Sequence, residues 1–74
     1  MKKQNRTITV FNNRTEIKTV FDTEQEQTQY YRNALRYYTK KHGAENVDVY
    51  TMGNTWRGFL WVIVNVWEQG KKPC

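Results

Sequence analysis

The chain has 74 residues and a net charge of +5, from twelve Lys and Arg against seven Asp and Glu. A chain of this length forms one small domain, whose core rarely supplies more than about 3–5 kcal/mol unless a disulfide, a metal or a second subunit assists. The only cysteine is Cys74 and the only histidine is His42, which excludes an internal disulfide and argues against a metal centre. Association with another molecule is therefore the expected source of extra stability.

The sequence predicts a cytoplasmic protein without a cofactor, in the host cytoplasm if the source is a virus. Its first residues, MKKQNRTITVF, are charged and lack the apolar segment of a signal peptide. The longest apolar run has nine residues, one of them Asn, against the roughly 20 needed to span a bilayer. A single thiol is typical of a reducing compartment. We expect no membrane partner.

The first predicted hairpin joins two strands rich in β-branched residues, Thr7–Phe11 and Arg14–Phe21. Asn12–Asn13 lies between them, and asparagine tolerates the positive φ angles of a two-residue hairpin turn. Such a turn places Ile8 opposite Ile17, and opposite residues share one face of the sheet.

A helix is predicted from Asp22 to His42. Thr23 and Glu26 have the spacing of a capping box, and Gly43 follows as a helix stop. Apolar side chains recur at i, i+3, i+4 and i+7 and form the stripe expected to pack on the sheet: Tyr31, Ala34, Leu35 and Tyr38.

The second predicted hairpin joins Val47–Met52 to Thr55–Trp67 through a two-residue turn at Gly53–Asn54. This turn would pair Met52 with Thr55, Tyr50 with Arg57 and Asp48 with Phe59. The element order is then ββαββ. We expect an α+β fold, a four-stranded and mainly antiparallel sheet with one amphipathic helix packed on one face. One domain covers residues 1–74, with basic flexible tails at 1–5 and 69–74.

The last strand contains FLWVIVNVW, Phe59–Trp67, which is apolar on both faces and is therefore expected in the middle of the sheet. The predicted pairing gathers one set of side chains under the helix: Ile8, Val10, Ile17, Phe21, Val47, Val49, Trp56, Leu60, Val62, Val64 and Val66, with Gly58 allowing a close approach. It gathers a second, aromatic set on the opposite face: Phe11, Tyr50, Phe59, Trp61, Ile63 and Trp67, with Met52 and Val20 beside them and Arg14, Lys18 and Arg57 interspersed. One helix cannot cover both faces, and exposed patches of this kind mark interaction surfaces.

Three interpretations of the aromatic face are open from the sequence. The face packs against a second copy or another protein, with the tryptophans as anchors. Alternatively, bases of a single strand stack on its rings while Arg14, Lys18 and Arg57 bind phosphates. In the third interpretation, sheet twist and the two tails shield the rings. Asn65, which interrupts the apolar run, is expected to face solvent near the strand end; its alternative role is to fix the register of a symmetric interface.

Basic residues recur on the predicted outer face of the helix. Arg32, Arg36 and Lys40 are spaced i, i+4 and i+8, a stripe about 12 Å long, flanked by Tyr30 and Tyr37. By itself such a stripe is typical of a solvated helix face. In a dimer it would double, and with the lysines of the two tails it would follow a phosphate backbone without sequence specificity.

The chain is not expected to be an enzyme. It contains no serine, its acidic residues at the start of the helix have a capping role there, and its four glycines form no phosphate-binding loop. In brevity, element order and aromatic content it resembles small accessory proteins of phages and other mobile elements, many of which disable a host enzyme or defence system. That resemblance transfers no residues.

The sequence thus predicts a small non-enzymatic accessory protein that forms a homodimer and binds RNA or single strands with low specificity. The nucleic-acid-binding candidates are Arg14, Lys18, Arg32, Arg36, Lys40, Lys41 and Arg57. The candidates for the dimer or partner interface are Phe11, Tyr50, Phe59, Trp61, Ile63 and Trp67. The alternative is a protein-binding inhibitor that docks its aromatic face on a host or defence protein without touching nucleic acid.

Overall fold

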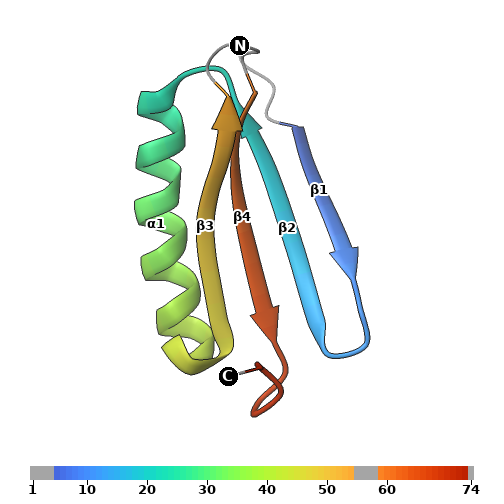
Figure 1. Ribbon diagram of the computed structural model, residues 1–74. Helices are drawn as coiled ribbons and strands as arrows, with labels where there is room; N and C mark the ends of the chain where they lie inside the picture. The colour runs from blue at the N-terminus through green and yellow to red at the C-terminus, as the bar shows by residue number, and fades with distance from the viewer. Residues whose placement is uncertain (1–4, 55–58, 74) are drawn as a thin grey trace.

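The computed structural model describes residues 5–54 and 59–73 and confirms the α+β class and the ββαββ order (Figure 1). Its elements are β1 (Asn5–Val10), β2 (Arg14–Phe21), α1 (Glu24–His42), a 3-10 turn η1 (Ala44–Asn46), β3 (Val47–Asn54) and β4 (Phe59–Trp67). The predictions made for Lys2, Lys3, Thr55, Trp56, Arg57, Gly58 and Cys74 lie outside the described residues. None of the described helices is long and apolar enough to cross a lipid bilayer.

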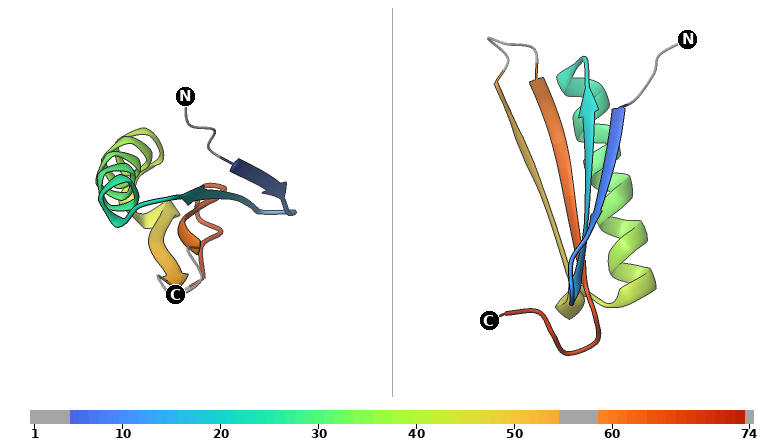
Figure 2. Two further views of the ribbon diagram at one scale, coloured as in Figure 1. Left: turned by 90° about the horizontal axis from the view of Figure 1, so that it is seen from above. Right: turned by 90° about the vertical axis from the view of Figure 1, so that its right-hand side faces the viewer.

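The four strands form one antiparallel sheet in the order β1-β2-β4-β3. The last strand, β4, therefore lies inside the sheet, between β2 and β3, as its two apolar faces predict. Since β2 and β3 are both antiparallel to β4, they run parallel to each other, and α1 connects them across β4. The helix lies against one face of the sheet (Figure 2).

The first hairpin has the predicted register. Ile8 lies opposite Ile17, and the Phe11 amide donates to the Arg14 carbonyl over 2.7 Å. Asn12 and Asn13 close the turn without a positive φ angle at either residue, so the turn is not the positive-φ type that we expected from asparagine.

The predicted register of the second hairpin is wrong. Gly53 and Asn54 belong to β3 and not to a turn, and Asn54 lies opposite Phe59. The backbones are so close at Gly53 that a Cβ atom there would lie 2.6 Å from the Phe59 carbonyl oxygen. The glycine is therefore explained by a close approach of two strands, because its φ angle is not positive.

The predicted faces survive this register error. Tyr50 lies opposite Ile63 instead of Arg57, a displacement of six positions. Because side chains alternate with a period of two, an even displacement leaves every side chain on its expected face.

The helix has the predicted caps but begins at Glu24, two residues later than expected. The Glu26 amide donates to the Thr23 hydroxyl over 3.2 Å, and that hydroxyl donates to the Glu26 carboxylate over 3.1 Å. At the other end Gly43 adopts a φ angle of +90°, and its amide donates to the Thr39 carbonyl over 2.9 Å. Glycine suits this stop because a side chain is strained at such an angle.

The core lies between α1 and the strands β2, β3 and β4. Its buried apolar residues are Phe21, Ala34, Val47, Val49, Leu60, Val62 and Val64, with Ile17, Tyr30, Tyr31, Tyr38 and Val66 packed around them. The expectation for Leu35 is wrong, because its side chain is exposed and Tyr30 packs on Phe21 instead.

The prediction that Ile8 and Val10 belong to this core is also wrong. Both lie on the helix side of the sheet, yet both are exposed, Val10 to 75%. A helix is about 10–12 Å wide and strands are about 4.8 Å apart, so one helix covers roughly two strands. Because α1 lies over β3 and β4, the outer strand β1 extends beyond it.

Gln27 is a buried polar residue of the helix that the apolar pattern did not reveal. Its side-chain amide donates to the Met52 carbonyl over 3.2 Å and to the Trp61 carbonyl over 2.9 Å. Met52 and Trp61 are opposite residues of β3 and β4, so this one side chain connects the helix to both strands.

Residues 69–73, which we expected to be a flexible tail, turn back and bond to the start of β3. The Gly70 amide donates to the side chain of Asn46 over 3.3 Å, and the Lys72 ammonium donates to the Val47 carbonyl over 2.9 Å. Asn46 is buried, and its own amide group donates to the His42 carbonyl over 3.0 Å. This asparagine therefore joins the end of the helix to the C-terminal segment.

We expect Gln27→Leu to lower the free energy of unfolding by about 1–3 kcal/mol, because it removes the two hydrogen bonds that join the helix to the Met52 and Trp61 carbonyls. Urea unfolding followed by circular dichroism measures this change. Gln29→Leu is the matched control, since Gln29 is exposed on the same helix and its replacement should cost less than about 0.5 kcal/mol. Equal losses in the two variants would contradict the bridging role of Gln27.

Candidate functional site

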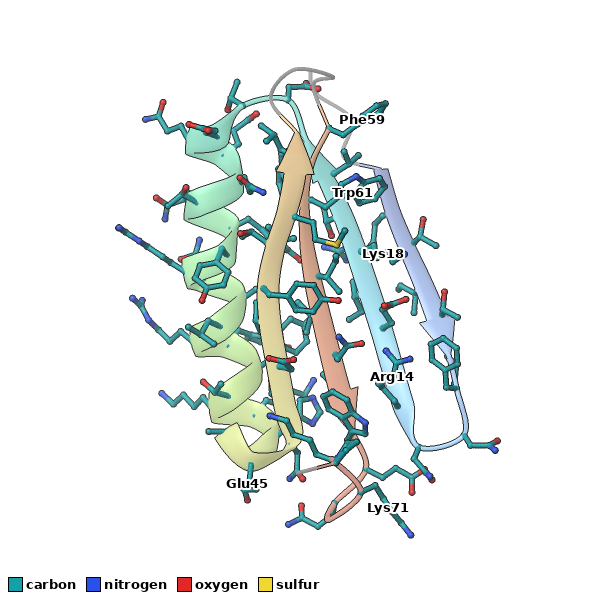
Figure 3. All side chains as sticks on the ribbon, in the orientation of Figure 1. Arg14, Lys18, Glu45, Phe59, Trp61 and Lys71 are labelled. Carbon is teal, nitrogen blue, oxygen red and sulfur yellow. The ribbon has the colours of Figure 1, made fainter. Side chains whose placement is uncertain are left out.

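We call the face of the sheet opposite α1 the open face. Among the described residues no helix or strand covers it (Figure 2). The strand pairing places these side chains there: Arg14, Glu16, Lys18 and Val20 from β2, Asp48, Tyr50 and Met52 from β3, and Phe59, Trp61, Ile63, Asn65 and Trp67 from β4. Phe11, just beyond β1, lies beside Arg14. Figure 3 shows Phe59 and Trp61 at one end of this face, Arg14 at the other and Lys18 between them.

The Arg14 end of the open face is occupied by the protein's own side chains. The Arg14 guanidinium lies 4.2 Å from the centre of the Phe11 ring and 5.9 Å from that of Trp67. It lies 3.7 Å from the Glu16 carboxylate, and it donates a hydrogen bond to the Asn65 side chain. The Lys72 ammonium lies 5.7 Å from the same Trp67 ring. Both rings at this end therefore have cationic partners within the protein, and the Phe11 ring remains partly exposed.

Asn65 does not face solvent, and this expectation is wrong. The residue is 5% exposed, and its side-chain oxygen accepts the hydrogen bond from Arg14. It lies opposite Glu16 on one side and Asp48 on the other, because β4 has a neighbouring strand at both edges. A buried amide oxygen needs such a donor, since leaving it unpaired is costly.

Ile63, a predicted interface residue, is already covered within the monomer. It is 2% exposed, although it points to the open face. Its cross-strand neighbours are Lys18 on β2 and Tyr50 on β3. Ile63 therefore has almost no surface left for a partner.

The Phe59 end of the open face keeps an exposed apolar patch. Phe59 is 52% exposed, Met52 is exposed on β3 opposite the neighbouring Trp61, and Tyr50 is exposed further along β3, opposite Ile63. Trp61 is half-buried between Met52 and Val20, its opposite residues on β3 and β2. Of the predicted interface residues, Phe59 and Trp61 thus lie at this end, and Tyr50 lies further along β3.

The described strands of the open face contribute equal numbers of cations and carboxylates, and Lys72 adds one cation at the Trp67 end. The strands contribute the cations Arg14 and Lys18 and the carboxylates Glu16 and Asp48. Because the chain as a whole has a net charge of +5, most of its excess positive charge lies elsewhere.

The outer face of α1 carries exposed cations, as the helical spacing predicts. We call Arg32, Arg36, Lys40 and Lys41 the basic helix face; all four are exposed. Among the described residues, none of these four cations forms an ion pair with a carboxylate, whereas Arg14 forms one with Glu16. Arg57, the remaining nucleic-acid-binding candidate, lies outside the described residues.

Two tyrosines at the C-terminal half of α1 separate the basic helix face from the core. Tyr38 packs against the core, and burial raises the pKa of its hydroxyl above its ordinary value. Tyr37 is exposed, and the Lys41 ammonium lies 5.5 Å from the centre of its ring. In residues 5–54 and 59–73 no group of three or more His, Cys, Asp or Glu side chains is placed to hold a metal ion.

Comparison with known proteins gave no match. No family model, no curated protein and no solved structure matches the chain. What the protein binds is therefore inferred from its own surface.

We expect Arg14→Met to lower the free energy of unfolding by about 1–3 kcal/mol, because the buried Asn65 oxygen loses its donor. Lys18→Met makes the same change at an exposed position of the same strand and should alter stability by less than about 0.5 kcal/mol. Urea unfolding distinguishes the two residues. If Arg14→Met were as stable as Lys18→Met, then Arg14 would not have the structural role inferred from its contacts.

Proposed function

We propose that the protein is a non-enzymatic nucleic-acid-binding protein that acts as a homodimer and binds the phosphate backbone of RNA or single strands. The observation that carries the proposal is the basic helix face, four exposed cations on one element without a described carboxylate partner. Cations that are not neutralised within the protein can replace the counterions of a phosphate backbone, and that exchange supplies most of the affinity in non-specific binding.

The second part of the proposal is a dimer formed through the Phe59 end of the open face. A small core needs additional stabilisation, and Phe59, Met52 and Tyr50 are exposed apolar groups that a second copy would cover. Charge supports this arrangement. The described strands of the open face carry as many carboxylates as cations, and Lys72 lies at the opposite end from Phe59. Two basic chains can therefore approach at the Phe59 end without strong repulsion, while their basic helix faces point outward.

Binding should depend on the basic helix face and not on net charge alone. We expect Arg32→Glu combined with Arg36→Glu to weaken binding to a single-stranded polynucleotide by about tenfold or more. The slope of log K against log salt, which is negative, should become shallower by about 1.4, because two phosphate contacts are lost. Fluorescence anisotropy between about 50 and 200 mM salt measures both quantities.

The matched control for this variant combines Arg6→Glu with Lys71→Glu, two exposed cations away from the basic helix face. Each double variant has a net charge of +1, since each reversal removes two units from +5. The control should keep most of the affinity. Equal losses of affinity in the two variants would show that the basic helix face contributes no more than other cations. A wild type without measurable affinity for polyanions would refute nucleic-acid binding.

We expect Phe59→Lys to convert the dimer into a folded monomer, because it places a charge in the centre of the proposed apolar contact. Sedimentation equilibrium measures the mass, and circular dichroism confirms that the variant is folded. Val10→Lys is the control, since Val10 is an exposed apolar residue on the other side of the sheet. A monomeric wild type, or a Phe59→Lys variant that dimerises as the wild type does, contradicts the dimer.

The exposed apolar patch also favours a second candidate function, the docking of a host or defence protein on the open face. Aromatic residues are the usual anchors of protein interfaces, and Phe59 and Tyr50 are available for that role. This candidate predicts a complex that persists after nuclease treatment and is lost in Phe59→Lys. Steep dependence of binding on salt instead supports the nucleic-acid proposal.

A further inference from the structure

A groove runs along one side of the basic helix face. It is lined by Asn33, Arg36, Tyr37, Lys40 and Lys41, which recur on successive turns of α1. The lining is mainly apolar although three of its five residues are cationic, so the Tyr37 ring and the aliphatic stems of the cations must supply most of it. A planar ring bordered by cations suits a nucleotide, since the base is planar and can stack on the ring while the anionic phosphate binds the cations.

Tyr37 presents an exposed ring in a fixed orientation. The ring is 55% exposed, yet it packs edge-on against Tyr38, with 4.9 Å between ring centres and an angle of 88° between their planes. Tyr38 in turn packs against the core. Edge-on aromatic contacts are favourable, so Tyr37 is held in place by a neighbour that cannot easily move.

The Lys41 ammonium has no anionic partner among the described residues. It lies 5.5 Å from the centre of the Tyr37 ring and 3.4 Å from the Tyr37 hydroxyl. At an exposed site an ammonium gains only about 0.5–1 kcal/mol from an aromatic ring. A phosphate is a stronger partner, so Lys41 can exchange the ring for a ligand anion at little cost.

We propose that this groove binds one nucleotide of a single-stranded nucleic acid. Its base stacks on Tyr37, and its phosphate is bound by Arg36, Lys40 and Lys41. The inference rests on the proposed nucleic-acid-binding function and adds the class of ligand, a strand with an unpaired base. In a duplex the faces of the bases are covered by their neighbours, so a ring on a convex helix surface cannot reach them.

The test compares Tyr37→Leu, which keeps apolar volume without an aromatic face, with Tyr37→Phe, which keeps the ring. The probes are an end-labelled thymidine single strand about 10 nucleotides long and an abasic strand with the same number of phosphates. We expect Tyr37→Leu to bind the thymidine strand about five- to a hundredfold more weakly, and Tyr37→Phe to bind it as the wild type does. On the abasic strand all three proteins should bind alike, and the salt dependence should not change.

The outcomes separate this inference from the function on which it rests. If the wild type binds both strands and Tyr37→Leu binds the thymidine strand equally well, base stacking on Tyr37 is refuted while phosphate binding stands. If Tyr37→Leu loses affinity equally on both strands, Tyr37 has a structural role only and the inference is again refuted. If the wild type binds neither strand, the proposed function fails and the inference fails with it.

Discussion

One helix packs on a sheet of four strands, and most features of this protein follow from that mismatch in width. A helix covers roughly two strands, and α1 contacts mainly β3 and β4. The helix side of β1 and the whole open face therefore have no cover among the described elements. The protein's own side chains cover part of the open face, and we propose that a second copy of the chain covers another part.

Polar side chains supply much of the order that a small apolar core cannot. Gln27 connects the helix to the backbones of β3 and β4, and Asn46 connects the end of the helix to the C-terminal segment. On the other side of the sheet, Arg14 donates to the buried Asn65. Each of these side chains adds directional hydrogen bonds between separate elements, and the loss of Arg14 would also leave the buried Asn65 oxygen without its donor.

The basic helix face and the exposed Phe59 end of the open face lie on opposite sides of the sheet. The described strands balance their charges on the open face, whereas the basic helix face on the far side carries four cations without a carboxylate partner. With this arrangement the self-association and the polyanion binding that we propose would use different faces, so that neither would block the other. The Tyr37 groove fits the same division, because it adds an aromatic ring to the charged side.

The sequence by itself determined the elements and their faces. The capping residues, the helical stripe and the alternation along each strand depend on residues close together in the chain, and they predicted the ββαββ order and the open face. Even with the wrong register for the second hairpin, the faces were correct, because only the parity of the displacement matters. Only the tertiary structure decided burial. Ile63 and Asn65 are covered because β4 has a neighbour on both sides, and Val10 is exposed because the helix does not reach β1. Those outcomes depend on strand order and on where the helix rests, and contacts between residues distant in the chain set both.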